Sequence, residues 1–162
     1  MGDYTPIGVT DYVDISRLIN RYADAVVHRN GVQWSSCWAH DATWELGPGR
    51  NVEGIEAITK LWYGAMAGFA AVFHVVHNGE VWQGADADHA SARWYISESY
   101  QRADGTRGIL LAHYDDTYVR RDGRWWIASR RLTPHYAGAQ DLSATFQSTK
   151  DALVARGVAS DV

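Results

Sequence analysis

Apolar residues near the start of the chain recur at intervals of three and four, which is the spacing of one face of an α-helix. They fall within about 80° of one another on a wheel at about 100° per residue, and they are Ile15, Leu18, Ile19, Tyr22 and Val26. Thr10 precedes this stripe and is suited to cap a helix, while Asn30-Gly31 is a typical stop signal. We therefore expect a first amphipathic helix between Thr10 and Asn30.

The pattern that follows predicts three shorter elements. A helical piece is expected at Val32–Trp38 and a brief strand at Ala42–Leu46, which ends in a turn at Gly47-Pro48-Gly49. A second amphipathic helix is expected from about Gly54 to Ala67, because its apolar positions again share one face: Ile55, Ile58, Trp62 and Ala65.

The pattern then changes from helical spacing to alternation of apolar and polar residues over four long runs. Alternation of this kind is typical of half-buried strands. The runs are Phe69–Trp82, His89–Arg102, Arg107–Arg121 and Arg124–Tyr136. Asp104-Gly105 and Asp122-Gly123 separate neighbouring runs, and Asp-Gly pairs accept the positive φ angles of tight hairpin turns.

Four long strands joined by tight turns predict an antiparallel meander. Such a sheet can bury its concave face against the two amphipathic helices. We therefore expect an α+β fold in which a curved antiparallel sheet wraps around N-terminal helices, with residues 1–162 forming one domain. The last segment, Asp141–Arg156, is expected to be a helix or a tail packed on a neighbour.

Composition restricts the possible functions. The 162 residues are 46% hydrophobic and carry a formal net charge of −4, so duplex binding through clustered Lys and Arg is not expected. No apolar stretch approaches the ~20 residues that span a bilayer, and no signal peptide is visible. The lone Cys37 excludes an internal disulfide and fits a reducing, cytoplasmic compartment. Eight Trp and nine Tyr are the unusual feature.

Polar residues that interrupt apolar strand faces are the first candidates for chemistry. His74 shares a face with Val72 and Val76, and Glu98 shares one with Trp94 and Ile96. An ionised carboxylate among apolar neighbours is costly unless it is paired, and His is a common acid–base residue. The alternative interpretation is a hydrogen-bonded core His74 and a Glu98 that reaches water or an Arg.

Asp116 and Arg130 interrupt two further apolar faces in the same way. They are candidates for a site, or else a structural ion pair. Tyr22 lies in the buried stripe of the first helix, where its phenol needs a partner or can donate to a ligand. Asp24 and His28 project to the opposite, polar face and are expected to form a solvated pair.

Other chemistries lack their motifs. His74 and His77 lie on opposite faces of one predicted strand, so no metal site is expected. No dinucleotide fingerprint, phosphate-binding glycine loop or GxSxG motif is present, and no cofactor is expected. Cys37 on an aromatic-rich helix is interpreted as a core residue.

The order of several short motifs resembles the SnoaL-like polyketide cyclase/dehydratase superfamily, which has a nuclear-transport-factor-like cone fold. The resemblance covers roughly residues 10–136 and rests on Arg21-Tyr22-Ala23-Asp24-Ala25, His40-Asp41-Ala42-Thr43-Trp44-Glu45, Val52-Glu53-Gly54-Ile55-Glu56-Ala57-Ile58, Phe73-His74-Val75-Val76-His77-Asn78 and Asp122-Gly123-Arg124-Trp125-Trp126-Ile127. The motifs are more specific for the fold than for an activity, because the superfamily contains enzymes, binding proteins and assembly subunits.

Within the superfamily, the chain looks most similar to the scytalone dehydratase, bile-acid dehydratase and dehydrochlorinase group. The resemblance implies a catalytic His at His74, a catalytic Tyr at Tyr22 and an acid at Glu98. It also implies a pocket Trp at Trp44 and an active-site Arg at Arg130, all facing one cavity. The dehydratases place an Asp where Val27 stands here, so the usual His–Asp dyad requires a substitute such as Glu98 or Asp116.

The resulting hypothesis is a cofactor-independent lyase or isomerase for a hydrophobic cyclic hydroxy or keto substrate. His74, Tyr22, Glu98, Asp116 and Arg130 would be its catalytic residues. The walls of the pocket are expected to include Val27, Trp44, Val72, Trp94, Ala112 and Tyr114.

Two other functions stay open at this point. One is a non-catalytic ligand-binding or assembly subunit, like the small subunits of ring-hydroxylating dioxygenases. The other is an epoxide hydrolase of the limonene type, for which only Asp116 and Arg130 are suitably placed. Tyr95 and Trp125, interpreted as outward-facing, together with the resemblance favour a homo-oligomer, a trimer rather than a dimer.

Overall fold

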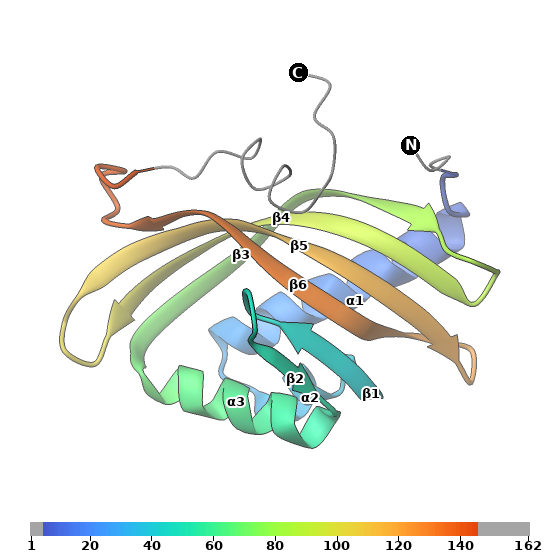
Figure 1. Ribbon diagram of the computed structural model, residues 1–162, viewed down its shortest axis with the longest axis horizontal. Coiled ribbons are helices and arrows are strands. Elements are labelled where there is room, and N and C mark those ends of the chain that lie inside the picture. The colour runs from blue at the N-terminus through green and yellow to red at the C-terminus, as the bar shows by residue number, and fades with distance from the viewer. Residues whose placement is uncertain (1–4, 146–162) are drawn as a thin grey trace.

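A computed structural model describes residues 5–145. They form a six-stranded curved sheet and three helices (Figure 1). The strand order is β2-β1-β6-β5-β4-β3. The elements are α1 (Val9–Val27), α2 (Gly31–Ser35), β1 (Trp38–Glu45), β2 (Asn51–Glu53), α3 (Ile55–Ala67), β3 (Phe69–Gln83), β4 (His89–Arg102), β5 (Arg107–Arg121) and β6 (Arg124–Gly138). This arrangement confirms the expected α+β class.

The first helix follows its predicted stripe but not its predicted cap. Ile15, Ile19 and Tyr22 are buried against the sheet. Gly8 is the N-cap and no side chain caps the helix, so Thr10 lies inside the first turn rather than before it. Helix α2 begins after Asn30, whose side chain caps it by accepting a hydrogen bond from the Gln33 amide at 3.0 Å, and it is shorter than expected because it ends at Ser35, before β1 begins at Trp38.

The predicted meander is present as β3-β4-β5-β6, each pair antiparallel. Two features of the sheet differ from the expectation. Strand β1 begins at Trp38, earlier than expected, and pairs with β6 in parallel. The short strand β2, which pairs with β1 through three residues, was not expected. Its exposed and mostly polar sequence is too short to show alternation.

Bulges in the long strands change which residues face the helices. In β6, Ser129 pairs with Thr117 and Ile127 with Tyr118, so Ala128 is an extra residue. Because one inserted residue reverses the alternation of faces, Trp125 faces the same side as Arg130 and is only 4% exposed. The prediction that Trp125 faces outward is therefore wrong. Tyr95 does lie on the outer face and is 40% exposed.

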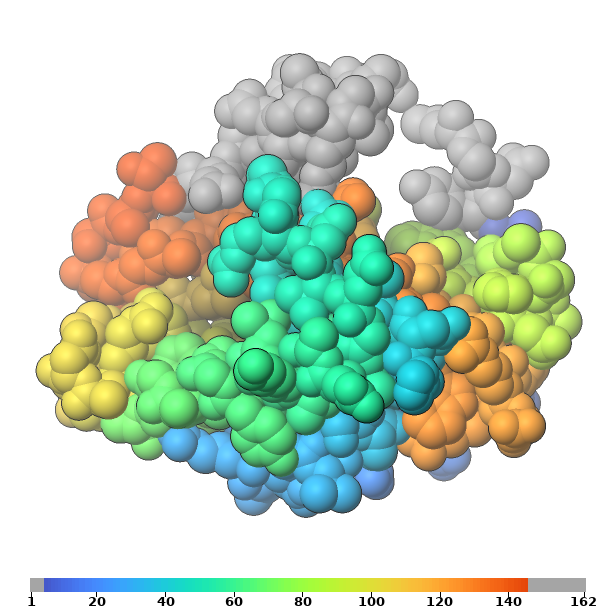
Figure 2. Space-filling model, turned by 60° about the horizontal axis from the view of Figure 1, so that its bottom comes forward, coloured from blue at the N-terminus to red at the C-terminus, as the bar shows by residue number. Residues whose placement is uncertain are grey.

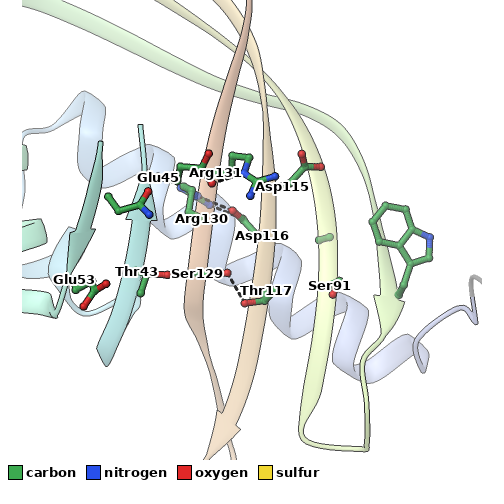
Figure 3. Close-up of a pocket in the computed structure, with 13 residues that line it drawn as sticks. Thr43, Glu45, Glu53, Ser91, Asp115, Asp116, Thr117, Ser129, Arg130 and Arg131 are labelled. Atoms are coloured by element: carbon green, nitrogen blue, oxygen red, sulfur yellow. Dashed lines mark hydrogen bonds and ion pairs between the residues drawn. The ribbon is translucent and has the colours of Figure 1, made fainter. Parts of the chain in front are cut away.

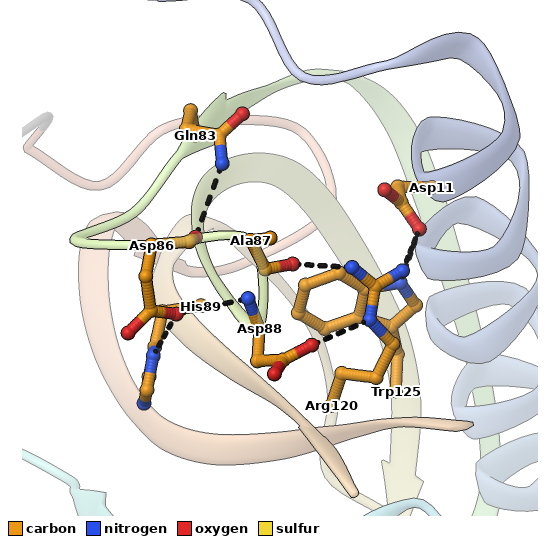
Figure 4. Close-up of polar contacts among 8 residues, drawn as sticks. All are labelled: Asp11, Gln83, Asp86, Ala87, Asp88, His89, Arg120 and Trp125. Atoms are coloured by element: carbon orange, nitrogen blue, oxygen red, sulfur yellow. Dashed lines mark hydrogen bonds and ion pairs between the residues drawn. The ribbon is translucent and has the colours of Figure 1, made fainter. Parts of the chain in front are cut away.

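Trp125 belongs to a polar network that fastens the start of α1 to the sheet (Figure 4). Its indole nitrogen donates to Asp11 at 2.9 Å, and the Arg120 guanidinium lies 4.7 Å from its ring centroid. Arg120 also bonds Asp11 at 2.6 Å, Asp88 at 2.9 Å and the carbonyl oxygen of Ala87. One arginine thus joins α1, the β3–β4 turn and β5.

The C-terminal expectation is only partly within the described chain. Residues 141–145 contain no helix. The rest of the predicted segment Asp141–Arg156 lies outside the described residues.

Gly79 on β3 lies so close to β4 that there is no room for a side chain. A Cβ there would lie 2.2 Å from Cε3 of Trp94 and 2.6 Å from the carbonyl oxygen of Arg93. We expect Gly79→Ala to lower the free energy of unfolding by about 2 kcal/mol, because the Trp94 ring must shift.

Gly64 provides the matched control for this substitution. It lies on the exposed face of α3 in its last turn, and a Cβ there would meet nothing within 4 Å. Gly64→Ala should raise the free energy of unfolding by roughly 0.5–1 kcal/mol. Urea denaturation of both variants measures the difference, and equal effects would contradict the assigned role of Gly79.

Candidate active site

A buried histidine–glutamate pair lies on the face of the sheet that packs against the helices. His74 on β3 and Glu98 on β4 are directly opposite each other in the antiparallel register. The His74 Nδ1 atom is 2.9 Å from Glu98 Oε2. The His74 side chain is 1% exposed and that of Glu98 is 16% exposed. Glu98 therefore supplies the acid that Val27 does not, and Val27 itself is only half-buried.

Asp116 has a different partner. The Arg130 guanidinium donates to both carboxylate oxygens of Asp116, at 2.8 and 2.7 Å, and both side chains are fully buried. Tyr118 also donates to Asp116 at 2.6 Å, and Trp94 donates to the Tyr118 hydroxyl at 3.0 Å. Asp116 and Arg130 thus form the ion pair that the sequence offered as an alternative, and Asp116 is not the partner of His74.

The two halves of this interior meet at Tyr22 and Tyr114. Arg130 Cζ lies 4.3 Å from the ring centroid of Tyr22 and 3.8 Å from that of Tyr114. The His74 ring lies 5.9 Å from the Tyr22 ring and 6.1 Å from the Tyr114 ring, centroid to centroid. The structure therefore brings together four of the predicted residues, Tyr22, His74, Glu98 and Arg130, with Asp116 behind Arg130.

Burial fixes the protonation of several of these groups. It raises the pKa of Tyr22 above its ordinary value, although the Arg130 charge acts in the opposite direction. Burial also raises the pKa of Tyr114 well above its ordinary value. For Arg130, burial acts to lower the pKa, but the Asp116 carboxylate outweighs it and the pKa is raised. Near neutral pH the site therefore presents two phenols and one guanidinium cation.

Several buried nitrogen atoms in this interior have no hydrogen-bond partner within the described part of the chain. They include Arg130 Nη1, His74 Nε2 and the indole nitrogens of Trp34, Trp38, Trp44 and Trp62. Trp34 contacts the other three tryptophans and is stacked on Trp62 at 4.9 Å between ring centroids. Because unpaired buried polar atoms are costly, the guanidinium and indole donors among them are suited to a ligand that carries hydrogen-bond acceptors.

The predicted wall residues divide into two groups. Trp44, Val72, Ala112 and Tyr114 are buried in the same interior. Trp94 is buried too, but its indole nitrogen is already bonded to Tyr118. The sequence analysis missed Trp34 as a neighbour of Tyr22, at 5.4 Å between ring centroids, although its place on an aromatic-rich helix was a usable signal.

The remaining sequence predictions concern Cys37, His77 and Asp24. Burial raises the pKa of the Cys37 thiol to about 11, which fits a core residue rather than a nucleophile. His77 points away from His74 and bonds Ser97 at 2.9 Å. Asp24 and His28 form an exposed pair at 3.1 Å, as expected.

A groove of about 430 Å³ on the outer face of the sheet is separate from this interior (Figure 3). Thr43, Ser129, Thr117 and Ser91 form one cross-strand row in it. Arg130 and Asp116 also border the groove, but their side chains are 0% exposed. His74, Glu98 and Tyr22 line neither this groove nor three further surface hollows near α1, β1 and α3.

Residues 5–145 contain no group of three or more His, Cys, Asp or Glu side chains placed to hold a metal ion. No helix in this range has the length and apolar character needed to cross a membrane.

The sequence over residues 8–131 matches the SnoaL-like domain. The chain belongs to the SnoaL-like domain family. The sequence matches no curated protein. The family assignment confirms the resemblance that the ordered motifs predicted, and the cone-like architecture agrees with it.

Solved structures share the fold of this SnoaL-like chain at low sequence identity. A candidate scytalone dehydratase from Novosphingobium aromaticivorans is 19% identical, with a TM-score of 0.76 over 87% of this chain and 95% of its own. The hexachlorocyclohexane dehydrochlorinase LinA-type3 from Novosphingobium barchaimii is 18% identical, with a TM-score of 0.74 over 86% and 95%. A candidate aromatic ring hydroxylase from N. aromaticivorans is 21% identical, with a TM-score of 0.73 over 90% and 97%.

The different partners of the two buried acids predict different effects on stability. We expect Asp116→Asn to lower the free energy of unfolding by about 3–5 kcal/mol, because it leaves the Arg130 charge buried and uncompensated. Glu98→Gln should change it by less than about 1 kcal/mol, since a Gln oxygen can still accept from His74 Nδ1.

Asp115 is the matched control for Asp116. It is the neighbouring residue on β5, but its side chain is 29% exposed, bonds Arg93 at 2.8 Å and lies 3.2 Å from His113 Nε2. Asp115→Asn should cost about 1–2 kcal/mol, less than Asp116→Asn, because water screens its charge. Chemical denaturation measures all three variants, and a loss for Glu98→Gln as large as that for Asp116→Asn would contradict the division of roles.

Proposed function

We propose that this SnoaL-like protein is a lyase or isomerase that needs no cofactor and uses His74 as its general base. The observation that carries the proposal is the buried His74–Glu98 pair, in which Nδ1 is bonded and Nε2 has no partner within the described residues. A base of this kind can remove a proton from a carbon next to a carbonyl group or from an equivalent activated position.

The pair determines which nitrogen of His74 can act. An ionised carboxylate only accepts hydrogen bonds, so Nδ1 carries the proton that is shared with Glu98. In the neutral ring, the lone pair is then on Nε2. After Nε2 takes a proton, the Glu98 carboxylate at 2.9 Å stabilises the imidazolium that forms. Glu98 is therefore a positioning residue that acts through His74.

The neighbouring groups are suited to the oxygen or leaving group of the substrate. Tyr22 stays protonated and can donate to an oxygen on which negative charge develops. The free Nη1 of Arg130 can donate to a substrate anion or a leaving group, while Asp116 holds the rest of the guanidinium in place. Trp44, Trp34 and the other aromatic walls would exclude water and favour a hydrophobic ring.

Similarity to known proteins supports the reaction class without deciding it. The names of two structurally similar proteins describe loss of water and loss of hydrogen chloride, which are both eliminations. An elimination starts from a proton transfer of the kind that His74 can perform. The substrate class we propose is a hydrophobic cyclic hydroxy or keto compound.

One observation favours the non-catalytic alternative. The side chains of His74, Arg130 and Tyr22 are buried, and neither the outer groove nor the three surface hollows near α1, β1 and α3 reach His74. A ligand-binding or assembly subunit, like the small subunits of ring-hydroxylating dioxygenases, does not need an accessible base. The experiment below separates the two functions.

The protein is also proposed to be a homo-oligomer, with a trimer favoured over a dimer. Phe73 is 61% exposed and Tyr95 is 40% exposed, and both lie on the outer face of the sheet. Apolar groups in that position are suited to a contact between subunits.

Proton abstraction can be tested without knowing the natural substrate. In deuterium oxide, the wild-type protein should accelerate exchange of the acidic C1 protons of 2-tetralone, followed by proton magnetic resonance. His74→Gln should lower the exchange rate by roughly 10²–10⁴-fold. Glu98→Gln should lower it by about 10-fold or more, because the imidazolium loses its counter-charge.

His77→Gln is the control, since His77 is on the same strand but on the opposite face. It should leave the exchange rate unchanged. Calorimetry on the same samples reports whether 2-tetralone binds. Binding without accelerated exchange would favour the binding or assembly function, and exchange that survives His74→Gln would remove His74 from the role of base.

A further inference from the structure

The inward face of β4 leads from the candidate active site to the surface. Glu98, Tyr100 and Arg102 lie on this face in sequence, and exposure rises along it from partly buried Glu98 to exposed Arg102. At about 3.4 Å per residue, the backbone of Arg102 lies roughly 14 Å from that of Glu98. Figure 2 shows the β4–β5 turn (yellow) beside the end of α3 (green) at this end of the molecule, where Ala103 donates to the carbonyl oxygen of Gly68 at 3.1 Å.

Arg102 is held in place by aromatic rings rather than by an acid. Its Cζ atom lies 5.6 Å from the Phe69 ring centroid and 5.1 Å from that of Tyr100. Among residues 5–145, no carboxylate lies within ion-pair distance of Arg102. The Asp104 carboxylate accepts from the Thr106 amide at 2.9 Å and interacts with the Arg102 charge only at longer range. The guanidinium of Arg102 is thus positioned by rings and makes no ion pair within the described residues.

A second arginine converges on the same place from the end of α1. Arg29 Nη2 donates to the carbonyl oxygen of Phe69 at 2.6 Å. Arg29 likewise has no ion-pair partner in the described chain, and its backbone adopts a φ of +53°. This left-handed conformation is disfavoured for a residue with a side chain. Phe69 therefore has one guanidinium over its ring and another on its carbonyl oxygen.

An apolar hollow lies beside Arg29. It has a volume of about 270 Å³ and is lined by Arg29 together with residues of α3, namely Trp62, Tyr63, Met66 and Ala67. Packed rings separate the hollow from the interior, because Trp62 stacks on Trp34, which in turn contacts Tyr22. Apolar surface beside guanidinium groups that make no ion pair is suited to a ligand with an apolar stem and an anionic end.

We propose that Arg29 and Arg102, which we call the arginine rim, bind an anionic group that the substrate carries on an arm outside the ring. This inference rests on the proposed function, because it assumes that the ring occupies the interior near His74. The substrate class then becomes a hydrophobic ring with a carboxylate- or phosphate-bearing arm. The rim sets specificity and takes no part in proton transfer.

Matched acidic and neutral probes test the rim by calorimetry. The probes are 4-(2-naphthyl)butanoate, its methyl ester, and 2-(2-naphthyl)ethyl phosphate. We expect wild-type protein to bind at least one anionic probe roughly tenfold more tightly than the ester at low ionic strength, and the advantage should shrink as salt is added. Arg102→Gln should remove about fivefold to tenfold of this preference and leave the affinity for the ester unchanged. The carboxylate and phosphate arms identify which anion is favoured.

Arg107→Gln is the matched control. Arg107 is also at this end of the sheet and exposed, but it pairs with Gln101 on the outer face. It should change the preference by less than about twofold, since exposed charges at a distance are screened. Arg29→Lys, which keeps the charge but loses the fork of donors, should reduce the preference less than Arg29→Gln does.

The outcomes separate the rim from the proposed function. Equal binding of ester and acids, or an unchanged preference in Arg102→Gln, would overturn the rim while leaving proton exchange on 2-tetralone as independent support for His74. His74→Gln should keep the preference for the anionic probes, because the rim does not act through the base. Absence of binding by all three probes would overturn the rim, whatever the exchange experiment shows.

Discussion

The interior of this protein depends on one fully buried ion pair, Arg130 with Asp116. Burying two charges is favourable only when their geometry is good and their remaining polar atoms are bonded. Here the guanidinium makes two short bonds to the carboxylate, Tyr118 satisfies a further carboxylate lone pair, and Tyr114 covers the cation. Arg130 Nη1 is the exception, because it has no hydrogen-bond partner among the described residues. The two residues are directly opposite each other on β5 and β6, so the pair joins these strands. It also places a permanent positive charge against the tyrosines of the site.

Because Asp116 is bonded to Arg130, it does not pair with His74. With Asp116 held by Arg130, the only described acid bonded to His74 is Glu98, on the neighbouring strand. The two acids therefore serve two different cations: one is permanent and structural, and the other exists only while the imidazole is protonated. The Tyr22 and Tyr114 rings lie against both His74 and Arg130, so that each charge interacts with its own partner more strongly than it would in water.

The class of fold and most residues of the candidate site could be predicted from the sequence, because both leave a mark on the alternation of apolar and polar residues along the strands. His74, Glu98, Asp116 and Arg130 were found as polar interruptions of apolar faces, and the ends of β4 and β5 agree with the prediction. What alternation cannot show is an extra residue within a strand. The Ala128 bulge in β6 placed Trp125 on the wrong face, and the pairing of acids with bases depended on cross-strand register, which one sequence does not contain.

The Ala128 bulge also has a consequence for how this chain can change over evolution. Because it resets the phase of β6 between Ile127 and Ser129, loss of that single residue would turn either Trp125 or Arg130 away from the interior. Substitutions at most positions of the strand alter one contact, whereas a change in its length alters every contact beyond it. Homologues that retain this arrangement should therefore vary in the identity of the residue at position 128 but keep the spacing around it, and a shortened strand would mark a relative in which Trp125 or Arg130 no longer faces the interior.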